Sequence, residues 1–352
     1  MMKIGFYSPY LDTFGGGERY MLTLASHLSL KHEVDIFWED SSVKAPLTRF
    51  LKIDLTKTNF VPNILKKNFI QKLISTRIYD LIFVLSNGSI PLVLSKKNIL
   101  HFQVPFKFEK PTLFTRLKLT RYQNVIVNSY FTKGFIDKSF NLNSQVIYPP
   151  VDIKAINPGF KEKIIISVGR FSANQLHPKK QDVLIDVFKE LSKKAHGWRL
   201  ILAGQAKKED QKYIRRLKKM SRGFAIRIME NLPAQNLRRI YANASIYWHA
   251  TGFGEDEVKN PERMEHFGIA TVEACAAGAV PIVINRGGQK EIVENGKNGF
   301  LWDTKTQLYN LTLELIENKN LLKKLSSAAV SSSTNFSQEK FLKAYEKIIF
   351  QN

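Results

Sequence analysis

Two carboxylates in the C-terminal half of the chain are the first candidates for chemistry. Glu265 and Glu273 stand in the segment Glu265-His266-Phe267-Gly268-Ile269-Ala270-Thr271-Val272-Glu273. On one continuous helix their side chains would point about 80° apart, so they would not face each other as an acid–base pair. We therefore predict that Glu265 lies in a loop and that Glu273 lies within the helix that follows. Two glutamates at this spacing are common by chance, so the order of the whole segment carries the argument.

The start of that helix is a candidate anion site. Gly268, Ile269 and Ala270 would supply backbone amides that have no partner inside the helix, and a helix N-terminus favours negative charge. Gly278 is predicted to end the helix. The same segment thus offers both carboxylates and anion-binding amides.

Cations follow another apolar run. Gly169-Arg170 comes directly after Ile164–Val168, and Lys179-Lys180 opens a helical pattern. An arginine fork and a lysine point charge could converge on one diphosphate. Solvated surface cations are the alternative, and they would be favoured if this loop stood alone.

A glycine-rich loop, Gly15-Gly16-Gly17-Glu18, follows the first apolar run. Gly16 and Gly17 would let backbone amides approach a ligand closely. The loop lacks the dinucleotide pattern G-x-G-x-x-G, because Tyr20 stands where the last glycine would be, and the chain has no Walker sequence. A flexible tight turn is an equal alternative.

Neither acids nor cysteines indicate a metal centre. The run Glu255-Asp256-Glu257 lies in a loop with Lys and Pro, where a solvated acidic loop is favoured over a metal site. Cys275 is the only cysteine, which excludes an intramolecular disulfide and a cysteine metal cluster. No metal and no cofactor are expected.

The elements that would position these residues are alternating strands and helices. Such alternation predicts an α/β fold with parallel sheets. The predicted strands are Lys3–Ser8, Glu33–Trp38, Tyr79–Leu85, Asn98–Gln103, Asn124–Asn128, Ile164–Val168, Trp198–Ala203, Ala244–His249 and Val280–Ile284. The predicted helices include Gly17–Leu30, Lys180–Lys194, Asn236–Ala242, Thr271–Ala277 and Gln338–Phe350.

The alternation of strands and helices is interrupted at Tyr148-Pro149-Pro150-Val151-Asp152. Two prolines there fix an extended backbone that suits a linker between domains. We predict one domain over residues 1–150 and a second over 151–335. Residues 336–352 would form a helix that packs on the first domain. Ligands of open parallel sheets bind at the carboxyl ends of the strands, so a cleft between the two domains is expected.

Composition limits the class of protein. The 352 residues include 53 Lys and Arg against 31 Asp and Glu, a net charge of +22, and 44 % are hydrophobic. That hydrophobic content excludes a mostly disordered chain. The N-terminal apolar run is too short for a signal peptide, and no apolar stretch approaches the ~20 residues of a membrane span. A cytoplasmic location is expected, with attachment to the inner face of a membrane as an option.

These segments together resemble the retaining GT-B glycosyltransferases of family 4, over nearly the whole chain. The glutamate segment in its context is the specific part, and the glycine loop is not. The matching segments are Gly15–Glu18, His101 in Leu100-His101-Phe102-Gln103, Gly169-Arg170, Lys179, Ala203-Gly204-Gln205, Glu265–Glu273, Gly287–Val293 and Asn298-Gly299-Phe300. The fold that this implies is two Rossmann-like domains facing a cleft, with the acceptor bound by the N-terminal domain and the donor by the C-terminal one.

The resemblance also implies roles. Arg170 and Lys179 would neutralise the diphosphate of a nucleotide sugar, and Glu273 would bind its ribose. Glu265 would approach hydroxyls of the transferred sugar. His101 would orient reacting groups, with a partly buried structural histidine as its alternative. Phe267, Gly268, Ile269 and Gly204 would line the donor site.

Two departures from the family pattern bear on these roles. Lys180 stands where many relatives have glycine, which leaves Lys179 and Lys180 as alternatives, with helix phasing in favour of Lys179. The insert Thr251–Met264 precedes Glu265 and, with the segment after it, looks like a branch of mannosyltransferases that act on lipid-linked oligosaccharides. Mannose is therefore the favoured sugar, and a glycan or a lipid-linked molecule is the expected acceptor.

Basic residues interleave with apolar ones in two N-terminal stretches. One contains Phe106, Lys107, Phe108, Lys110, Leu113, Phe114, Arg116, Leu117, Lys118, Leu119 and Arg121, and the other spans Asn63–Arg77. Each could contact an anionic membrane, with an ordinary amphipathic helix as an equal alternative.

Two rival functions remain from the sequence. The net charge would also suit a nucleic-acid-binding protein, but no recognition module or base-stacking array is recognisable, so no nucleic acid is expected. The other rival is a sugar-nucleotide-binding protein of the same fold that has lost catalysis.

Overall fold

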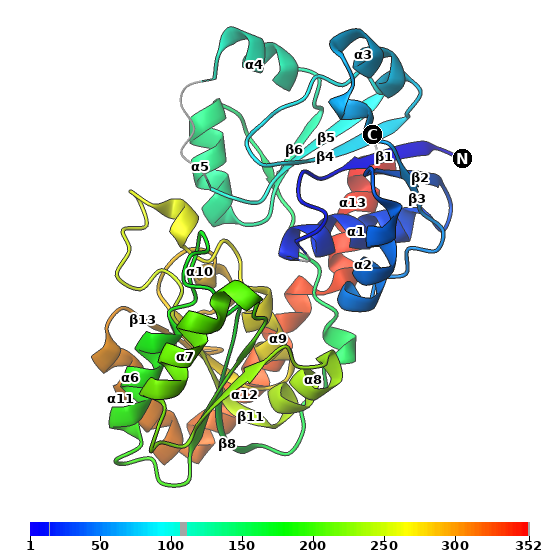
Figure 1. The fold of residues 1–352 in the computed structure, drawn as a ribbon. Coiled ribbons are helices and arrows are strands. Elements are labelled where there is room, and N and C mark those ends of the chain that lie inside the picture. Colours follow the sequence, from blue (N-terminus) through cyan, green and yellow to red (C-terminus); the bar gives the residue numbers. More distant parts are fainter. Residues whose placement is uncertain (14, 106–110, 351–352) are drawn as a thin grey trace. The chain divides into compact units, whose positions relative to one another are not determined.

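The fold was obtained as a computed structural model that describes residues 1–13, 15–105 and 111–350 (Figure 1). It divides into two compact units, which we describe separately. Unit 1 consists of Met1–Pro150 and the helix that begins at Gln338, and unit 2 is Val151–Ser337. The units divide at Pro150, the predicted linker, and unit 2 runs two residues beyond the predicted 335. Phe106, Lys107, Phe108 and Lys110 of the basic stretch lie outside the described residues.

Each unit contains one sheet in which every strand pairing is parallel. The strands are β1 (Lys3–Tyr7), β2 (Glu33–Phe37), β3 (Asn59–Val61), β4 (Leu81–Ser86), β5 (Lys97–Phe102), β6 (Asn124–Val127), β7 (Gln145–Val146), β8 (Glu162–Val168), β9 (Arg199–Gly204), β10 (Ile226–Glu230), β11 (Ala244–His249), β12 (Val280–Ile284) and β13 (Phe300–Trp302). The order is β3-β2-β1-β4-β5-β6-β7 in unit 1 and β10-β9-β8-β11-β12-β13 in unit 2. This topology confirms the predicted α/β class with two parallel sheets.

Helices connect the strands in both units. The α-helices are α1 (Gly16–Leu28), α2 (Lys44–Leu51), α3 (Phe69–Arg77), α4 (Leu113–Leu119), α5 (Tyr130–Phe140), α6 (Gln181–Leu191), α7 (Gln211–Met220), α8 (Ala234–Asn243), α9 (Ile269–Ala276), α10 (Gln289–Ile292), α11 (Lys305–Glu317), α12 (Lys319–Ser333) and α13 (Gln338–Phe350). Short 3-10 turns include η2 (Ile64–Lys66) and η5 (Pro261–Arg263). Among the described residues, none of the helices combines the length and the apolar character needed to cross a bilayer.

The sheet of unit 1 is buried on both faces. Along β4, Leu81, Phe83 and Leu85 pack into a cluster with α1, whereas Ile82 and Val84 pack into a second cluster on the opposite face. A parallel sheet that is covered on both faces reads as a continuous apolar run, which is why β4 could be predicted from sequence. The second cluster includes Ile64, which lies before α3, Tyr122, which lies between α4 and β6, and Phe140, which ends α5.

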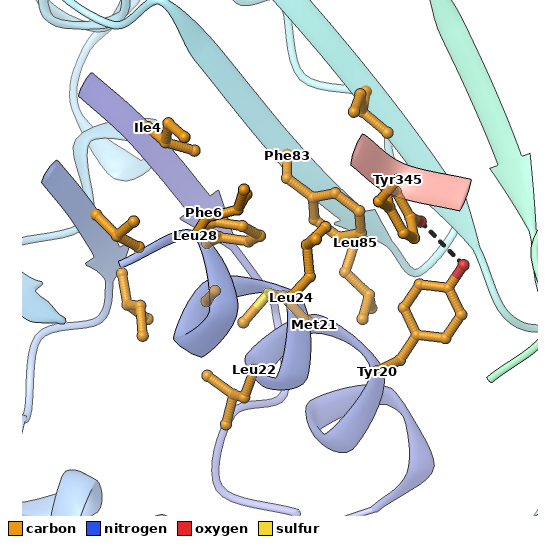
Figure 2. Close-up of a cluster of buried hydrophobic side chains, with 14 of the residues drawn as sticks. Ile4, Phe6, Tyr20, Met21, Leu22, Leu24, Leu28, Phe83, Leu85 and Tyr345 are labelled. Atoms are coloured by element: carbon orange, nitrogen blue, oxygen red, sulfur yellow. Dashed lines mark hydrogen bonds between the residues drawn. The ribbon is translucent and has the colours of Figure 1, made fainter. Parts of the chain in front are cut away.

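Helix α13 completes the core of unit 1. Phe341, Tyr345 and Ile349 are buried in the same cluster as α1 (Figure 2). The hydroxyls of Tyr20 and Tyr345 lie 2.9 Å apart, and the Tyr20 hydroxyl also donates to the carbonyl of Ile147 at 3.0 Å. Because 325 residues separate these two tyrosines, the two ends of the chain fold into one unit.

The sheet of unit 2 positions the donor-site candidates. Its strand order reverses between β8 and β11, which are neighbours in the sheet. The connections from these two strands leave toward opposite faces, and such a switch point is where open parallel sheets bind ligands. Residues that follow β8 and β11 are therefore brought to one edge.

Candidate active site

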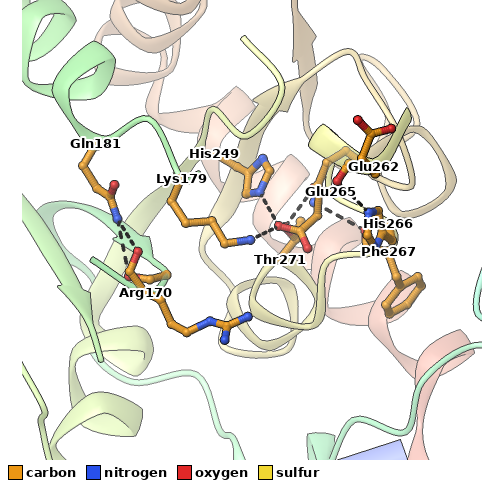
Figure 3. Close-up of polar contacts among 11 residues, drawn as sticks. Arg170, Lys179, Gln181, His249, Glu262, Glu265, His266, Phe267 and Thr271 are labelled. Atoms are coloured by element: carbon orange, nitrogen blue, oxygen red, sulfur yellow. Dashed lines mark hydrogen bonds and ion pairs between the residues drawn. The ribbon is translucent and has the colours of Figure 1, made fainter. Parts of the chain in front are cut away.

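Glu265 lies at the switch point of unit 2, in the loop before α9. Its Oε2 accepts a hydrogen bond from Lys179 Nζ at 2.6 Å and lies 2.9 Å from Nε2 of His249, the last residue of β11 (Figure 3). A carboxylate only accepts hydrogen bonds, so the His249 ring must carry its proton on Nε2. The loop before α9, the end of β11 and Lys179, two residues before α6, thus meet at one oxygen atom.

These contacts keep the Glu265 carboxyl ionised. Burial by itself would raise the pKa of Glu265, but Lys179 and His249 oppose it, and the pKa is held well below its usual range. Burial lowers the pKa of His249, against the hydrogen bond to Glu265, which raises it. At neutral pH the site therefore holds an anionic carboxylate and a neutral imidazole next to Lys179.

Arg170 extends from the end of β8 in the same direction as Lys179 (Figure 3). Its backbone carbonyl accepts a hydrogen bond from the Gln181 side chain at 3.1 Å, while the residue is exposed. Within the described part of the chain, the guanidinium of Arg170 forms no salt bridge. An exposed guanidinium beside the Lys179–Glu265 pair is available to an anionic ligand.

Two glycines allow β8, β9 and Lys179 to approach closely. A Cβ on Gly204 would lie 1.9 Å from the carbonyl oxygen of Gly169, and a Cβ on Gly169 would lie 2.7 Å from Cγ of Lys179. Gly204 therefore shapes the edge on which Arg170 stands. A contact between Gly204 and a substrate stays a prediction.

The loop from Glu265 to Gly268 rests on the turn Gly287-Gly288 before α10. Gly288 N donates to the Glu265 carbonyl at 2.8 Å, and a Cβ on Gly288 would lie 2.4 Å from the carbonyl oxygen of His266. Gly268 caps α9 at φ +121°, where its α-hydrogen faces the fully buried Gln289. Gln289 also accepts from the Thr271 hydroxyl at 2.8 Å. The glycine turn thus fixes the backbone that carries the catalytic candidates.

The structure places the remaining donor-site candidates around α9. Glu273 lies within α9, as predicted, and its carboxylate is close enough to the buried Tyr241 to contribute to the raised pKa of that phenol, after burial itself. Ile269 is half-buried at the first position of the helix, and Phe267 is buried against Phe336 with ring centroids 5.4 Å apart.

Lys179 and Lys180 have different partners. Lys180 Nζ lies 3.1 Å from Glu255, which also pairs with Arg263. Of these two lysines, Lys179 is the one that pairs with Glu265. Which of them contacts a diphosphate stays a prediction. Glu257 pairs with Lys290 and accepts from the amide of Gly287, so the acidic insert is bound to neighbouring cations and amides. Across the described residues, no group of three or more His, Cys, Asp or Glu is arranged to hold a metal ion.

In unit 1 the glycine loop opens α1, as predicted. Glu18 accepts from the amide of Gly15 at 2.6 Å and so caps the helix. Gly16 is exposed, and a Cβ on Gly17 would lie 2.7 Å from Oε1 of Gln103, just past the end of β5. Gly17 therefore makes room for a side chain at the carboxyl edge of the sheet.

His101 lies in the interior of unit 1. Its ring is fully buried, stacked on Tyr20 with centroids 4.0 Å apart and next to Phe83 at 5.8 Å. Burial lowers its pKa to about 3, so the imidazole is neutral. This position inside the core fits the alternative of a structural histidine. The catalytic role of His101 stays a prediction.

His249 is the contact that the sequence reasoning missed. It was predicted only as the end of a strand, although a histidine at the carboxyl end of a buried strand is placed where parallel sheets bind ligands. His177 is half-buried, and its pKa is lowered mainly by burial and then by Lys179; it was missed as well.

Comparisons with known proteins place the chain in a family. A model of the family "Glycosyl transferases group 1" matches residues 151–331. A GDP-Man:Man(3)GlcNAc(2)-PP-Dol alpha-1,2-mannosyltransferase of Dictyostelium discoideum is 24 % identical over 245 residues, which are 64 % of this chain and 46 % of that protein. An alpha-1,3/1,6-mannosyltransferase of Rhizomucor pusillus is 27 % identical over 213 residues, 50 % of this chain and 46 % of that protein. The chain thus spans about half the length of these relatives.

A solved structure extends the likeness to both units. HepE of Anabaena, in complex with UDP and glucose, superposes with a TM-score of 0.71 and 19 % identity, covering 99 % of each chain. At this identity the likeness concerns the fold, which is GT-B. The resemblance predicted from the sequence, to GT-B glycosyltransferases with a mannosyltransferase branch, is confirmed. Since the family model covers more than half of the chain, the protein belongs to the glycosyl transferases group 1.

Proposed function

We propose that this chain is a retaining glycosyltransferase that moves a hexosyl group from a nucleotide-diphosphate sugar to a glycan or a lipid-linked acceptor. The observation that carries the proposal is the cluster at Glu265. An ionised carboxylate, Lys179 and the exposed Arg170 stand at the switch point of unit 2, beside the N-terminus of α9. Cations suit a diphosphate, and a carboxylate suits the hydroxyls of a sugar.

Arg170 and Lys179 would stabilise the leaving nucleoside diphosphate. As the bond from the sugar to the phosphate oxygen breaks, negative charge grows on that oxygen, and preorganised cations lower the energy of the charged transition state. The amides at the start of α9 would add to this effect. In this proposal the two side chains supply the positive charge, and a metal ion is not required.

Glu265 would bind the transferred sugar. A carboxylate accepts hydrogen bonds from two vicinal hydroxyls, and its low pKa keeps it ionised for this purpose. Glu273 would bind the ribose hydroxyls in the same way. For retention, the acceptor oxygen would attack on the face from which the diphosphate departs. The acceptor proton would pass to the departing phosphate oxygen, and no covalent sugar–enzyme intermediate is needed.

Mannose is the sugar that we favour. The name of the Dictyostelium relative pairs GDP-Man with an acceptor on PP-Dol, and the Rhizomucor relative is also named a mannosyltransferase. These names support GDP-mannose as the first donor to test and a lipid-linked glycan as the first acceptor.

A thermal-shift screen against UDP-, GDP- and ADP-sugars tests donor binding. A ligand that binds only the native state stabilises it and so raises the melting temperature. At a ligand concentration of a hundred times the Kd, the stabilisation is about 2.7 kcal/mol. We expect one nucleotide to give a shift that EDTA leaves unchanged. If no nucleotide sugar raises the melting temperature, the donor site is assigned wrongly.

Arg170→Ala tests the role of the guanidinium in transfer. We expect kcat to fall about 10²–10³-fold, because one stabilising group of the transition state is removed. The matched control is Arg215→Ala, which removes an exposed arginine from α7 of the same unit and should leave kcat unchanged. Release of nucleotide from the donor in the presence of acceptor is the measurement. Unchanged kcat in Arg170→Ala would contradict the proposal, and donor binding without any release by the wild type would indicate a binding protein.

A further inference from the structure

Helices α3 and α4 of unit 1 expose apolar side chains in regular stripes. On α3 and its C-terminal end, Ile70, Ile74 and Ile78 recur every four residues and are 61–69 % exposed. On α4, Leu113 and Leu117 share the same spacing and are 85 % and 62 % exposed. Residues four apart lie on one face of a helix, so each helix presents an apolar stripe to the outside.

These stripes are not the core-facing sides of the helices. Helix α4 has no buried residue, and Thr76 is the one buried residue of α3. The segments beside them supply the core contacts instead, since Ile64 and Tyr122 are buried in the cluster on one face of the sheet. Both helices therefore belong to the layer on that face, opposite the layer formed by α1 and α13, and they appear together at one end of unit 1 (Figure 1).

The same part of the chain carries an excess of positive charge. Between positions 55 and 136 there are thirteen Lys and Arg and only two acidic residues, which accounts for about half of the net charge of +22. Within the described residues, no salt bridge neutralises Lys66, Lys67, Lys72, Arg77, Arg116 or Lys118. By contrast, Arg216 and Lys218 of the equally basic α7 pair with Asp182 and Glu230.

Cations and apolar groups are interleaved on these helices. Lys118 Nζ lies 4.5 Å from the ring centroid of Phe114, and Arg116 is exposed between Leu113 and Leu117. A nucleic acid would attract the cations but would leave the aliphatic stripes in water. An anionic bilayer satisfies both, because apolar side chains enter the boundary of the acyl chains while Lys and Arg reach the headgroups.

We propose that this face of unit 1 docks on an anionic lipid bilayer. We call it the basic apolar face and define it by Lys66, Lys67, Ile70, Lys72, Ile74, Arg77, Ile78, Leu113, Phe114, Arg116, Leu117 and Lys118. Docking needs neither donor nor acceptor, so the proposal stands or falls independently of the glycosyl transfer.

Vesicle co-sedimentation of the full chain tests the proposal. Vesicles of phosphatidylcholine alone are compared with an equimolar mixture of phosphatidylcholine and phosphatidylglycerol. We expect binding to the mixed vesicles, weak binding to the neutral ones, and a loss of binding as salt rises, because screening shortens the reach of surface charge.

Two double variants separate the two contributions. Lys67→Gln with Arg77→Gln should weaken binding by about fivefold per cation removed. Ile70→Ser with Ile74→Ser keeps the charge and should weaken binding roughly tenfold. Both pairs are exposed, so circular dichroism melting should match the wild type.

Matched controls lie in unit 2. Lys323→Gln with Lys324→Gln removes two exposed lysines from α12, and Phe160→Ser removes an apolar side chain that is 85 % exposed. Neither should change sedimentation. Equal binding to neutral and anionic vesicles, or wild-type binding by both variants of the basic apolar face, would overturn the proposal. Loss of binding in the charge variant alone, together with tight binding to duplex DNA, would also overturn it in favour of a nucleic acid.

Discussion

Glu265 shows how one carboxylate depends on residues far from it in sequence. Lys179 precedes it by 86 residues and His249 by 16, yet both contact the same oxygen. Each contact lowers the pKa of Glu265 against the opposing effect of burial. If transfer requires the ionised form of Glu265, the pH below which activity is lost reports how far Lys179 and His249 lower the pKa of Glu265.

Replacing His249 tests this dependence. His249→Leu removes one donor, so the pKa of Glu265 should rise and the acid limb of the kcat/KM profile should move to higher pH. His249→Gln can place an amide donor near the position of Nε2 and should shift the limb less. We expect kcat of the Leu variant to fall about tenfold to a hundredfold, by analogy with other positioning partners of charged ligands.

The pH profile distinguishes positioning from packing. A variant that only loosened unit 2 would lower the melting temperature without moving the acid limb. If His249→Leu and His249→Gln both keep the acid limb of the wild-type kcat/KM profile, His249 does not control the ionisation of Glu265.

The positions of Arg170, Lys179 and Glu265 could be predicted because each lies next to a recognisable run. Arg170 follows a buried strand, and Lys179 and Glu265 precede helices. His249 was missed although it ends a predicted strand. Its contact with Glu265 depends on the pairing of β8 with β11, which the local sequence does not show. The burial of His101 was considered from the sequence only as the alternative to a role at the reacting groups. It is the fifth of the six residues of β5, and in a sheet covered on both faces every such position is buried, whichever way the side chain points.

At the scale of elements, the turn Gly287-Gly288 controls the loop that carries Glu265. Gly288 has an ordinary φ of −68°, so its need for glycine is steric and not conformational. In Gly288→Ala the new Cβ would collide with the backbone of His266 and Phe267, at 2.4 and 2.6 Å. We expect the loop to shift and kcat to fall at least tenfold, since misplacement by about 1 Å costs up to 10²-fold.

Gly134→Ala is the control for this substitution. Gly134 lies within α5, and a Cβ there meets no atom within 4 Å. The substitution should raise the free energy of unfolding by about 0.5–1 kcal/mol, because alanine favours a helix interior over glycine, and should leave kcat unchanged. Denaturant titration and steady-state kinetics measure both. Equal kcat values in Gly288→Ala and Gly134→Ala would show that the turn Gly287-Gly288 does not position the loop that carries Glu265.

The strands that escaped sequence reasoning share a place in the fold. The strands β3, β7, β10 and β13 were not predicted, and all four lie at the edges of their sheets. Three of them have only two or three residues. Edge strands are short and have one unpaired side, so they lack the long apolar run that identified the central strands.

At the scale of the whole molecule, unit 1 depends on both ends of the chain. Tyr345 of α13 is fully buried against Tyr20 and Phe83. Tyr345→Ala should lower the free energy of unfolding by about 3–5 kcal/mol through the cavity it leaves, and Tyr345→Phe by about 1 kcal/mol through the lost hydrogen bond.

Hydrogen exchange locates this loss. Protection of amides in α1, β1 and β4 should fall in Tyr345→Ala, while protection in unit 2 should persist, because the cluster around Tyr345 lies within unit 1. Phe160→Ala, an exposed aromatic of unit 2, serves as the control. Uniform loss of protection across both units would contradict this division of the chain.

The return of α13 to unit 1 has a consequence for biosynthesis. A ribosome that has completed residues 1–150 has not yet made the helix that covers Tyr20 and Phe83, and it must first translate Val151–Ser337. At the usual rates of translation that interval lasts roughly 10–40 s. Unit 2 emerges as one continuous stretch and can fold while the N-terminal segment still waits with part of its core exposed. Chaperones that bind nascent apolar surface should therefore associate with residues 1–150 for longer than with the segment made after it.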